Sequence, residues 1–433
     1  MTRLPTIWLA KFLRVAVRLT GRNSGSALPG LVVEKISPDF LEQMCGRLPL
    51  GVVVVTGTNG KTTTTRLLTH LLSGQGLRVL SNPSGSNLTR GVVSTIIEHS
   101  TLAGRLEYDV AVFELDEAFS PHFTKIARPK LLIALNVHRD QLDRYGEIDS
   151  AASLIARAAS HASKVLVNGE DDLLVEQIKH TRPESKILEF TMSTELRATL
   201  VTEDTFNIAK KQVHRMVMTS FAQLTGSTKK QQGRQVFDGV VGGDHVHVTL
   251  PLLGVHNAFN ALAALAGLKI VLPKVNLADA SAVLADFKPA FGRGESLTVK
   301  GHKVTVALIK NPSGFMQNLR TFVDPTVDKI LIIINDRYAD GRDVSWLWDT
   351  DVSNLRNFKG EIYLAGRRRY DIALRLKYEG ITHHVIETSD AAEGLRTLVD
   401  TKGEAHLLIM PTYTAMLSAR KWLADQKGVR DLW

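Results

Sequence analysis

One stretch near the start of the chain, VVVVTGTNGKTTTT at residues 52–65, constrains the fold more than any other. Its four valines predict a short buried strand, and the RLLTHLL that follows predicts a helix. The glycine-containing turn between them has the residue types of a phosphate-binding loop, whose backbone N–H groups surround a polyphosphate at a helix N-terminus. The spacing departs from G-x-x-x-x-G-K-[ST], because Val55 stands where the first glycine would be. We predict that this loop binds a nucleoside triphosphate; the alternative is a glycine-rich turn without a ligand.

The residues in and near this loop suggest how it would hold a nucleotide. We expect Lys61 to be an exposed loop residue that neutralises the β- and γ-phosphate oxygens, and the Thr62 hydroxyl to hold Mg²⁺. A second predicted strand, DVAVFEL, presents Glu114 and is followed by Asp116 and Glu117. Glu114 is the expected carboxylate partner of Mg²⁺, which prefers one or two carboxylates plus phosphate oxygens. The predicted nucleotide-binding residues of the loop are Gly57, Thr58, Asn59, Gly60, Lys61, Thr62 and Thr63.

Composition restricts the class of protein. The formal charge of +9 over 433 residues implies anionic partners, such as a nucleotide, a nucleic acid or a phosphate-bearing lipid surface. The basic residues are scattered and no aromatic platform interleaves them, which argues against a nucleic-acid-dependent ATPase. Cys45 is the only cysteine, so an internal disulfide and a thiolate-based zinc site are excluded. Without a long apolar run or a signal peptide, the sequence favours a cytoplasmic protein.

Residues 7–19, IWLAKFLRVAVRL, have the pattern of a basic amphipathic helix. One face is apolar, and the opposite face carries Lys11, Arg14 and Arg18. We favour a helix that packs on its own domain with a solvated basic edge, because a single helix of this kind anchors weakly. The alternative is peripheral attachment to the inner face of the plasma membrane.

Strands and helices alternate along most of the chain. From residue 45 to residue 270, VVVVT, DVAVFEL, KLLIALN and KVLVN are each followed by a helical pattern, which predicts an α/β fold with a doubly wound parallel sheet. A polar segment at about 190–250 interrupts the pattern and predicts a β-rich insertion with a flexible tip near TGSTKKQQGRQ. A second α/β unit begins near Gly292, with VTVALI, KILIIIN, EIYLAG, THHVIE and AHLLIM as its strands. The predicted parts are 1–44 (helix and linker), 45–290 (ATP-binding domain) and 291–433 (C-terminal domain).

Several motifs resemble one enzyme superfamily. T-G-T-N-G-K-T, E-x-D-E after a strand, N-x-x-x-D-x-x-D from Asn136 and G-x-H-N before an alanine-rich helix are similar to the central domain of Mur ligases. Four longer strings narrow the resemblance to the MurT family, the synthetase subunits of lipid II isoglutaminyl synthase. These strings are KNPSGFMQNL (310–319), INDRYADGRDVSWLWD (334–349), AGRRRYDIALRLKYEG (365–380) and MPTYTAMLSAR (410–420). The resemblance covers nearly the whole chain.

The resemblance implies a reaction and a partner. ATP would phosphorylate the α-carboxylate of D-glutamate in the stem peptide of lipid II, at the membrane surface, and ammonia would attack the acyl phosphate. The family receives its ammonia from GatD, a class I glutamine amidotransferase, and no nucleic acid is involved. A same-class alternative is another ATP-dependent carboxylate–amine ligase of the superfamily. An alternative from another class is a nucleotide-binding scaffold without catalysis, against which the retention of Lys61, Thr62 and Glu114 argues.

The resemblance also assigns residues beyond the phosphate loop. Asn168, His256 and Asn257 would border the adenine, and Arg293 would reach the phosphates. The family supplies an aspartate that completes the Cys–His pair of GatD, since a carboxylate orients such a histidine. The candidate here is Asp349, with Asp343 and Asp351 as neighbouring alternatives, and a helix-cap or turn role remains open for each.

The sequence departs from related patterns at three places. Gln141 stands where the amino-acid-adding ligases carry a metal-binding histidine, and Lys310-Asn311-Pro312 replaces their acidic, histidine-bearing loop. Both changes match the MurT pattern. MurT proteins commonly insert a four-cysteine zinc ribbon, but the corresponding stretch at about 195–245 has no cysteine. His214, His245 and His247 do not make up a four-ligand structural site, so we expect no zinc.

Overall fold

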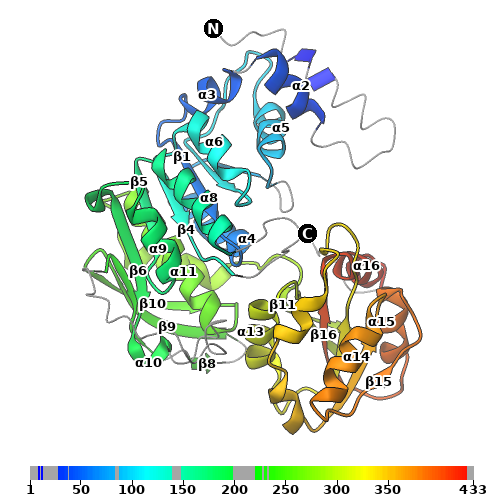
Figure 1. Ribbon diagram of the computed structural model, residues 1–433. Coiled ribbons are helices and arrows are strands. Elements are labelled where there is room, and N and C mark those ends of the chain that lie inside the picture. Colours follow the sequence, from blue (N-terminus) through cyan, green and yellow to red (C-terminus); the bar gives the residue numbers. More distant parts are fainter. Residues whose placement is uncertain are drawn as a thin grey trace.

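The computed structural model describes residues 8, 9, 11, 12, 28–37, 39–82, 87–138, 148–197, 220–226, 229–231 and 234–426. Within these ranges two β-sheets, each with helices packed on it, make up the molecule (Figure 1). The predicted α/β class with a doubly wound sheet is confirmed. The predicted domain bounds stay predictions.

The first sheet has the strand order β10-β9-β7-β6-β5-β4-β1-β3-β2, and β8 pairs with β9. Neighbouring strands from β2 to β7 are parallel, while β9 runs antiparallel to β7, β8 and β10. Its strands are β1 (Val52–Thr56), β2 (Val79–Ser81), β3 (Val110–Glu114), β4 (Leu131–Ala134), β5 (Lys164–Asn168), β6 (Ile187–Met192), β7 (Ala222–Leu224), β8 (Lys229–Gln231), β9 (Arg234–Val241) and β10 (Asp244–Leu250). The β-rich segment thus extends the first sheet itself, and of its predicted tip at 225–235, residues 227–228 and 232–233 lie outside the described residues.

Helices cover both faces of this sheet, as a continuous apolar strand requires. They are α2 (Leu28–Ile36), α3 (Phe40–Cys45), α4 (Lys61–Gly74), α5 (Thr89–His99), α6 (Ser120–Ala127), α8 (Ile148–Ser160), α9 (Asp172–Lys179), α10 (Thr194–Arg197), α11 (Val255–Val271) and α12 (Leu277–Ala282), with short 3₁₀ turns η2 (Glu184–Lys186) and η4 (Val283–Asp286). In the part of the chain that the structure describes, every helix is too short or too polar to span a bilayer.

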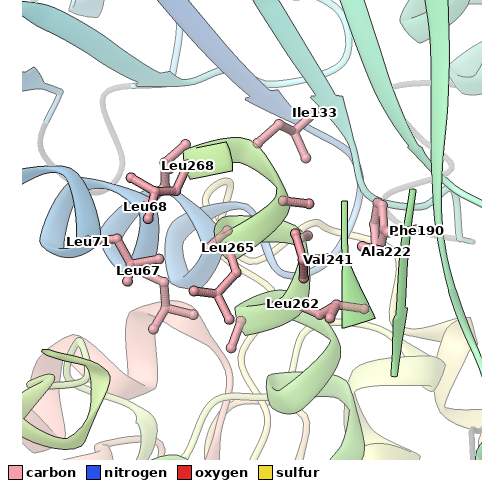
Figure 2. Packing of buried hydrophobic residues seen from close by; sticks show 14 of the residues in the cluster. Leu67, Leu68, Leu71, Ile133, Phe190, Ala222, Val241, Leu262, Leu265 and Leu268 are labelled. Atoms are coloured by element: carbon pink, nitrogen blue, oxygen red, sulfur yellow. The ribbon is translucent and has the colours of Figure 1, made fainter. Parts of the chain in front are cut away.

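The valines of β1 alternate between two cores. Val53 and Val55 belong to the cluster under α4 and α11, whereas Val52 and Val54 belong to the cluster on the opposite face. Figure 2 shows leucines of α4 beside leucines of α11, at Leu67, Leu68, Leu71, Leu265 and Leu268. Burying each leucine contributes about 1.5–3 kcal/mol, so α4 and the loop before it rest on a rigid base.

The second sheet has the order β11-β12-β16-β13-β14-β15, in which β11 is antiparallel to β12 and the other pairs are parallel. Its strands are β11 (Arg293–Val299), β12 (His302–Ala307), β13 (Lys329–Ile333), β14 (Glu361–Ala365), β15 (His384–Val385) and β16 (His406–Pro411). Its helices are α13 (Pro312–Phe322), α14 (Arg369–Tyr378), α15 (Ala391–Val399) and α16 (Tyr413–Ala424), with 3₁₀ turns η5 (Ser345–Asp349) and η6 (Ser353–Asn357). The sequence reading missed β11, because this edge strand is mostly half-exposed and lacks the apolar run of a central strand.

The predicted N-terminal helix lies largely outside the described residues. Of residues 7–19 the structure describes 8, 9, 11 and 12, all of them helical. The Trp8 indole donates to the Leu102 carbonyl at 2.9 Å, and Lys11 Nζ donates to the Glu98 carbonyl at 3.3 Å. These contacts favour a helix that packs on its own domain, although Trp8 and Phe12 remain exposed.

Candidate nucleotide-binding and ligase site

The phosphate loop has a shape that only glycine allows at two positions. Gly57 and Gly60 have φ of 131° and 86°, values that L side chains rarely adopt. A Cβ on Gly57 would lie 2.9 Å from the backbone N and O of Asn136, and one on Gly60 would lie 2.5 Å from Asn260 Oδ1. Asn136 Oδ1 accepts from the Asn59 N–H at 2.8 Å, and its Nδ2 donates to the Asn59 carbonyl at 3.1 Å. These contacts therefore fix the backbone of the loop against the segment that follows the end of β4.

The structure brings together the two predicted Mg²⁺ ligands. Thr62 Oγ1, in the first turn of α4, donates to Glu114 Oε2 at 2.8 Å. Asn82 fixes the backbone of Glu114 by donating to its carbonyl and accepting from its N–H, both at 2.9 Å. A hydroxyl and a carboxylate side by side are hard oxygen donors of the kind that Mg²⁺ takes beside phosphate oxygens. The residues present therefore fit this cation.

Lys61 is not the exposed residue that the sequence reading expected. Its side chain is 9% exposed, because the first turn of α4 lies against the end of β3. Its Nζ forms an ion pair with Glu117 Oε2 at 3.1 Å and also donates to the carbonyls of Gly57 and Thr58. Glu117 Oε1 in turn accepts from Thr58 Oγ1 at 3.1 Å. Burial alone would raise the pKa of Glu117, but the charges of Lys61 and Lys310 outweigh burial and lower it.

A cavity of about 370 Å³ opens beside the loop, between the two sheets, a size that suits a nucleotide. It is lined by the loop, by the ends of β4 and β5, by the start of α11 and by the second domain. The predicted residues on its wall are Asn59, Gly60, Thr63, Asn168, His256, Asn257 and Arg293. Their contact with a nucleotide stays a prediction.

Burial lowers the pKa values of three basic groups on the cavity wall, and neighbouring charges add to this effect or oppose it. Burial, and after it the charge of Arg293, lowers the pKa of His256 to about 4, and burial with the charge of Lys310 lowers that of His138 to about 4. Both imidazoles are therefore neutral at pH 7. Burial also lowers the pKa of Arg293, opposed by the charges of Glu114 and Glu295. The charge of the acid that is expected to bind the cation thus acts on Arg293 as well.

Two family models match the chain. The Mur ligase middle domain matches residues 55–268, and the MurT ligase C-terminal domain matches residues 308–416. The subunit MurT of lipid II isoglutaminyl synthase (glutamine-hydrolyzing) from Streptococcus pneumoniae is 30% identical, over 95% of this chain and 97% of that protein. The chain belongs to the MurT family. The MurT subunit from Staphylococcus aureus strain COL is 28% identical over 96% of each chain.

Solved structures show the same Mur ligase fold. MurF from Acinetobacter baumannii matches 92% of this chain and 80% of its own, with a TM-score of 0.69 and 20% identity. Folylpolyglutamate synthase from Mycobacterium tuberculosis, complexed with ADP and AMPPCP, matches 97% and 99% with a TM-score of 0.64 and 16% identity. At such identities the likeness concerns the fold alone.

The predicted partner-facing aspartate of the MurT pattern is not among the residues that line the cavity. Asp349 ends η5 in the second domain and is exposed. Asp343 accepts from the Ser345 N–H at 2.8 Å and from its hydroxyl at 2.9 Å, and Asp351 accepts from the Ser353 N–H at 2.9 Å. These two aspartates have the turn-capping role that the sequence left open. Asp349 stays the predicted partner-facing residue on the strength of the MurT pattern and its exposure, and its role stays a prediction.

Other predicted features are placed only in part. Gln141 and the acidic residues around it, as well as His214, lie outside the described residues. His245 and His247 are exposed on β10, and His247 Nδ1 lies 2.7 Å from Asp238 Oδ1. Among the described residues no group of three or more His, Cys, Asp or Glu side chains is arranged to bind a metal ion. That the MurT fold forms here without zinc stays a prediction.

Sequence reasoning named Glu117 and Lys310 but gave neither a role. Lys310 Nζ donates to the Thr58 carbonyl at 3.0 Å, so the second domain contacts the phosphate loop directly. Two features of the sequence could have pointed to these residues: Glu117 is a second carboxylate three residues after Glu114, and Lys310 stands where the related ligases have an acidic loop. Neither feature specifies a partner, because Lys61 and Glu117 are 56 positions apart in the chain and Lys310 and Thr58 are 252 apart.

Proposed function

We propose that this chain is the synthetase subunit of a glutamine-dependent amidotransferase. It would use ATP to convert the α-carboxylate of D-glutamate in the lipid II stem peptide to the amide of D-isoglutamine. The observation that carries the proposal is the match to MurT subunits over nearly the full length of both chains. The adjacent Thr62 and Glu114 support it, because they offer the hard oxygen donors that Mg²⁺-dependent phosphoryl transfer uses.

The proposed reaction has two steps. A carboxylate oxygen of the acceptor attacks the γ-phosphorus, the bond to the β–γ bridging oxygen breaks, and ADP leaves with that electron pair. Ammonia then attacks the acyl carbon, phosphate leaves, and the nitrogen loses a proton. Phosphoryl transfer depends mostly on positioning and charge neutralisation. The loop N–H groups, Lys61 and Arg293 supply these, and Mg²⁺ held by Thr62 and Glu114 would neutralise the β- and γ-phosphates.

The nucleotide is proposed to be ATP, because related Mur-type proteins were solved with ADP or AMPPCP. Asn168 at the end of β5 and His256 and Asn257 at the start of α11 would surround the adenine. The first turn of α11 is fixed locally, since Asn257 Nδ2 donates to the Leu253 carbonyl at 2.8 Å. The neutral His256 avoids placing a second cation beside Arg293.

A partner that releases ammonia is the second part of the proposal. The relatives are named as subunits of a glutamine-hydrolyzing enzyme, and the partner would be a GatD-type class I glutamine amidotransferase. An exposed aromatic pair begins at the residue before Asp349: Trp348 and Tyr378 are 48% and 75% exposed, with ring centroids 5.4 Å apart. Exposed aromatic side chains of this kind are enriched in protein interfaces. Because lipid II is membrane-bound, the complex would work at the cytoplasmic face of the membrane.

The test is reconstitution with purified components. The chain, co-expressed with a class I glutamine amidotransferase, is incubated with lipid II, ATP, Mg²⁺ and glutamine, and the stem peptide is analysed by mass spectrometry. Conversion of one carboxylate to an amide, a loss of about 1 Da, supports the proposal. Attachment of a whole amino acid would instead indicate another carboxylate–amine ligase. No ATP-dependent change with either glutamine or ammonium would refute the assignment.

A further inference from the structure

A short segment of the second domain contacts the phosphate loop. Lys310 Nζ donates to the Thr58 carbonyl at 3.0 Å. The next residue, Asn311, exchanges two amide hydrogen bonds with Asn59, at 3.1 and 3.4 Å. Asn311 also caps α13, since its Oδ1 accepts from the Gly314 N–H at 2.8 Å. Residues 310–311 are therefore anchored on their own helix and meet the loop in a defined position.

Glu117 lies at the centre of this contact. One of its oxygens accepts from Thr58 Oγ1 and the other forms the ion pair with Lys61, while its side chain is 5% exposed. The charge of Lys310 acts on the same carboxylate. Both groups also contact Thr58, whose carbonyl accepts from Lys310 Nζ and whose hydroxyl donates to Glu117 Oε1. Two ammonium groups from different domains thus lie near one buried acid.

Nucleotide binding would disturb this arrangement, because it brings negatively charged phosphates close to Glu117 and draws Lys61 away from it. The ammonium of Lys61 is expected to move toward the phosphate oxygens, which lie on the N–H side of the loop. A buried carboxylate that loses its cation is strongly destabilised, and Glu117 would also repel the incoming phosphates. A second cation is needed close to Glu117 for both charges to be accommodated. Lys310 is placed to be that cation.

We propose that Glu117 is a positioning residue that holds Lys61 while the phosphate loop is empty, and that Lys310 neutralises Glu117 once Lys61 turns to the phosphates. The inference rests on the nucleotide-binding part of the proposed function. It makes nucleotide binding depend on a residue of the second domain, so the loop binds ATP well only when both domains meet at 310–311. No covalent bond to Lys310 forms or breaks.

The experiment measures binding of a non-hydrolysable ATP analogue with Mg²⁺ by calorimetry on the full chain. Lys310→Gln keeps a donor for the Thr58 carbonyl but removes the charge, and we expect the dissociation constant to rise about tenfold. Glu117→Gln keeps the size and the acceptor for Thr58, and affinity should stay the same or increase. The decisive variant combines both changes. Its affinity should return to within about threefold of Glu117→Gln alone, because the acid that needed neutralising is gone.

Control variants distinguish neutralisation of Glu117 from a purely structural contact between the two domains. Lys303→Gln, on the exposed far end of β12, should leave affinity unchanged. Asn311→Ala removes a neighbouring interdomain contact without removing charge, so adding Glu117→Gln should not restore any affinity that it loses.

Two results would overturn the proposal: a double Lys310/Glu117 variant that binds as weakly as Lys310→Gln, or normal affinity of Lys310→Gln. If Glu117→Gln does not fold, Lys310→Arg, which keeps the positive charge, takes its place in the test. The proposal then requires that Lys310→Arg bind the ATP analogue within about threefold of wild type and that Lys310→Gln bind it more weakly than that. A wild-type chain that binds no nucleotide would instead refute the proposed function.

Discussion

The phosphate loop and the surface around Asp349 are opposite kinds of functional region. The loop is buried and held by many contacts: glycine φ angles, the Asn136 bonds, the Lys61–Glu117 ion pair and the packed α4 behind it. The Asp349 surface is exposed, lies on a 3₁₀ turn and presents Trp348 and Tyr378 to solvent. The loop carries within one chain nearly everything that the proposed chemistry needs, whereas the role proposed for the other surface requires a second molecule to cover it.

This difference predicts how substitutions should behave. Changes in the loop should affect ATP use whatever the nitrogen source, and several should also affect stability. Changes around Asp349 should leave stability and ATP use alone and affect only reactions that involve the partner.

The largest effect is expected for Lys61→Ala. Removing a preorganised cation from a phosphoryl-transfer site should lower the rate of ATP turnover by about 10²- to 10³-fold with glutamine or with ammonium. The substitution also leaves Glu117 with only Lys310, so the free energy of unfolding should fall by up to about 3 kcal/mol. Turnover is read from phosphate release and stability from urea unfolding. Adding Glu117→Gln should recover stability but not turnover; amidation at the wild-type rate by Lys61→Ala would contradict the site.

Asp349→Asn should have the next largest effect, and only with glutamine. An asparagine keeps the size but loses the charge that orients a histidine of the partner, so glutamine-driven amidation should fall about 10²-fold or more. Amidation driven by added ammonium should stay within about twofold. Asp343→Asn and Asp351→Asn are matched controls, because those residues cap turns. Equal loss with both nitrogen sources would place Asp349 in the synthetase chemistry or in folding, and no loss would exclude it as the partner's aspartate.

The sequence predicts the loop well because its determinants are local. Strand, turn and helix follow one another within residues 52–65, and the chemistry of Lys61 and Thr62 is fixed by their positions in that unit. The sequence could not predict that Lys61 is buried on Glu117, or that Lys310 reaches Thr58, because these contacts depend on how β3 and the second domain pack. It likewise missed the edge strand β11, whose polar residues carry no sign of the sheet beside it. In the Asp349 region it named three aspartates, and the choice among them stays a prediction because it depends on a partner's surface that this chain does not carry.

Gly60→Ala should have an intermediate effect and test whether the loop's shape itself matters. The new Cβ would need φ of 86° and would lie 2.5 Å from Asn260 Oδ1, so the loop must shift. Affinity for the ATP analogue should fall about tenfold, while stability changes by about 1 kcal/mol. Gly76→Ala is the matched control: its φ is 79°, but a Cβ there meets nothing within 4 Å. It should show a similar change in stability and no change in affinity, and a drop in affinity there would mean that strain in α4 propagates to the loop.

The smallest effect is expected from pH, through His256. Its pKa is lowered from 6.5 to about 4 by burial and by Arg293, so the folded chain binds this proton less readily than the unfolded chain. Above pH 6.5 His256 is neutral in both states, and it has no effect on the pH dependence of stability. As the pH falls from 6.5 toward 4, the unfolded chain takes up the proton first, so the free energy of unfolding decreases. Between pH 7 and pH 4.5 the full shift would be worth about 2.5 kcal/mol, but His256 is only half-buried on the cavity wall, so screening by water reduces it. His256→Gln should therefore flatten this acid limb by about 1 kcal/mol between pH 7 and pH 4.5 in urea unfolding. His245→Gln, at an exposed position on β10, should leave the limb unchanged. The same limb in wild type and His256→Gln would mean that the cavity wall around Arg293 is open to water, unlike the loop it faces.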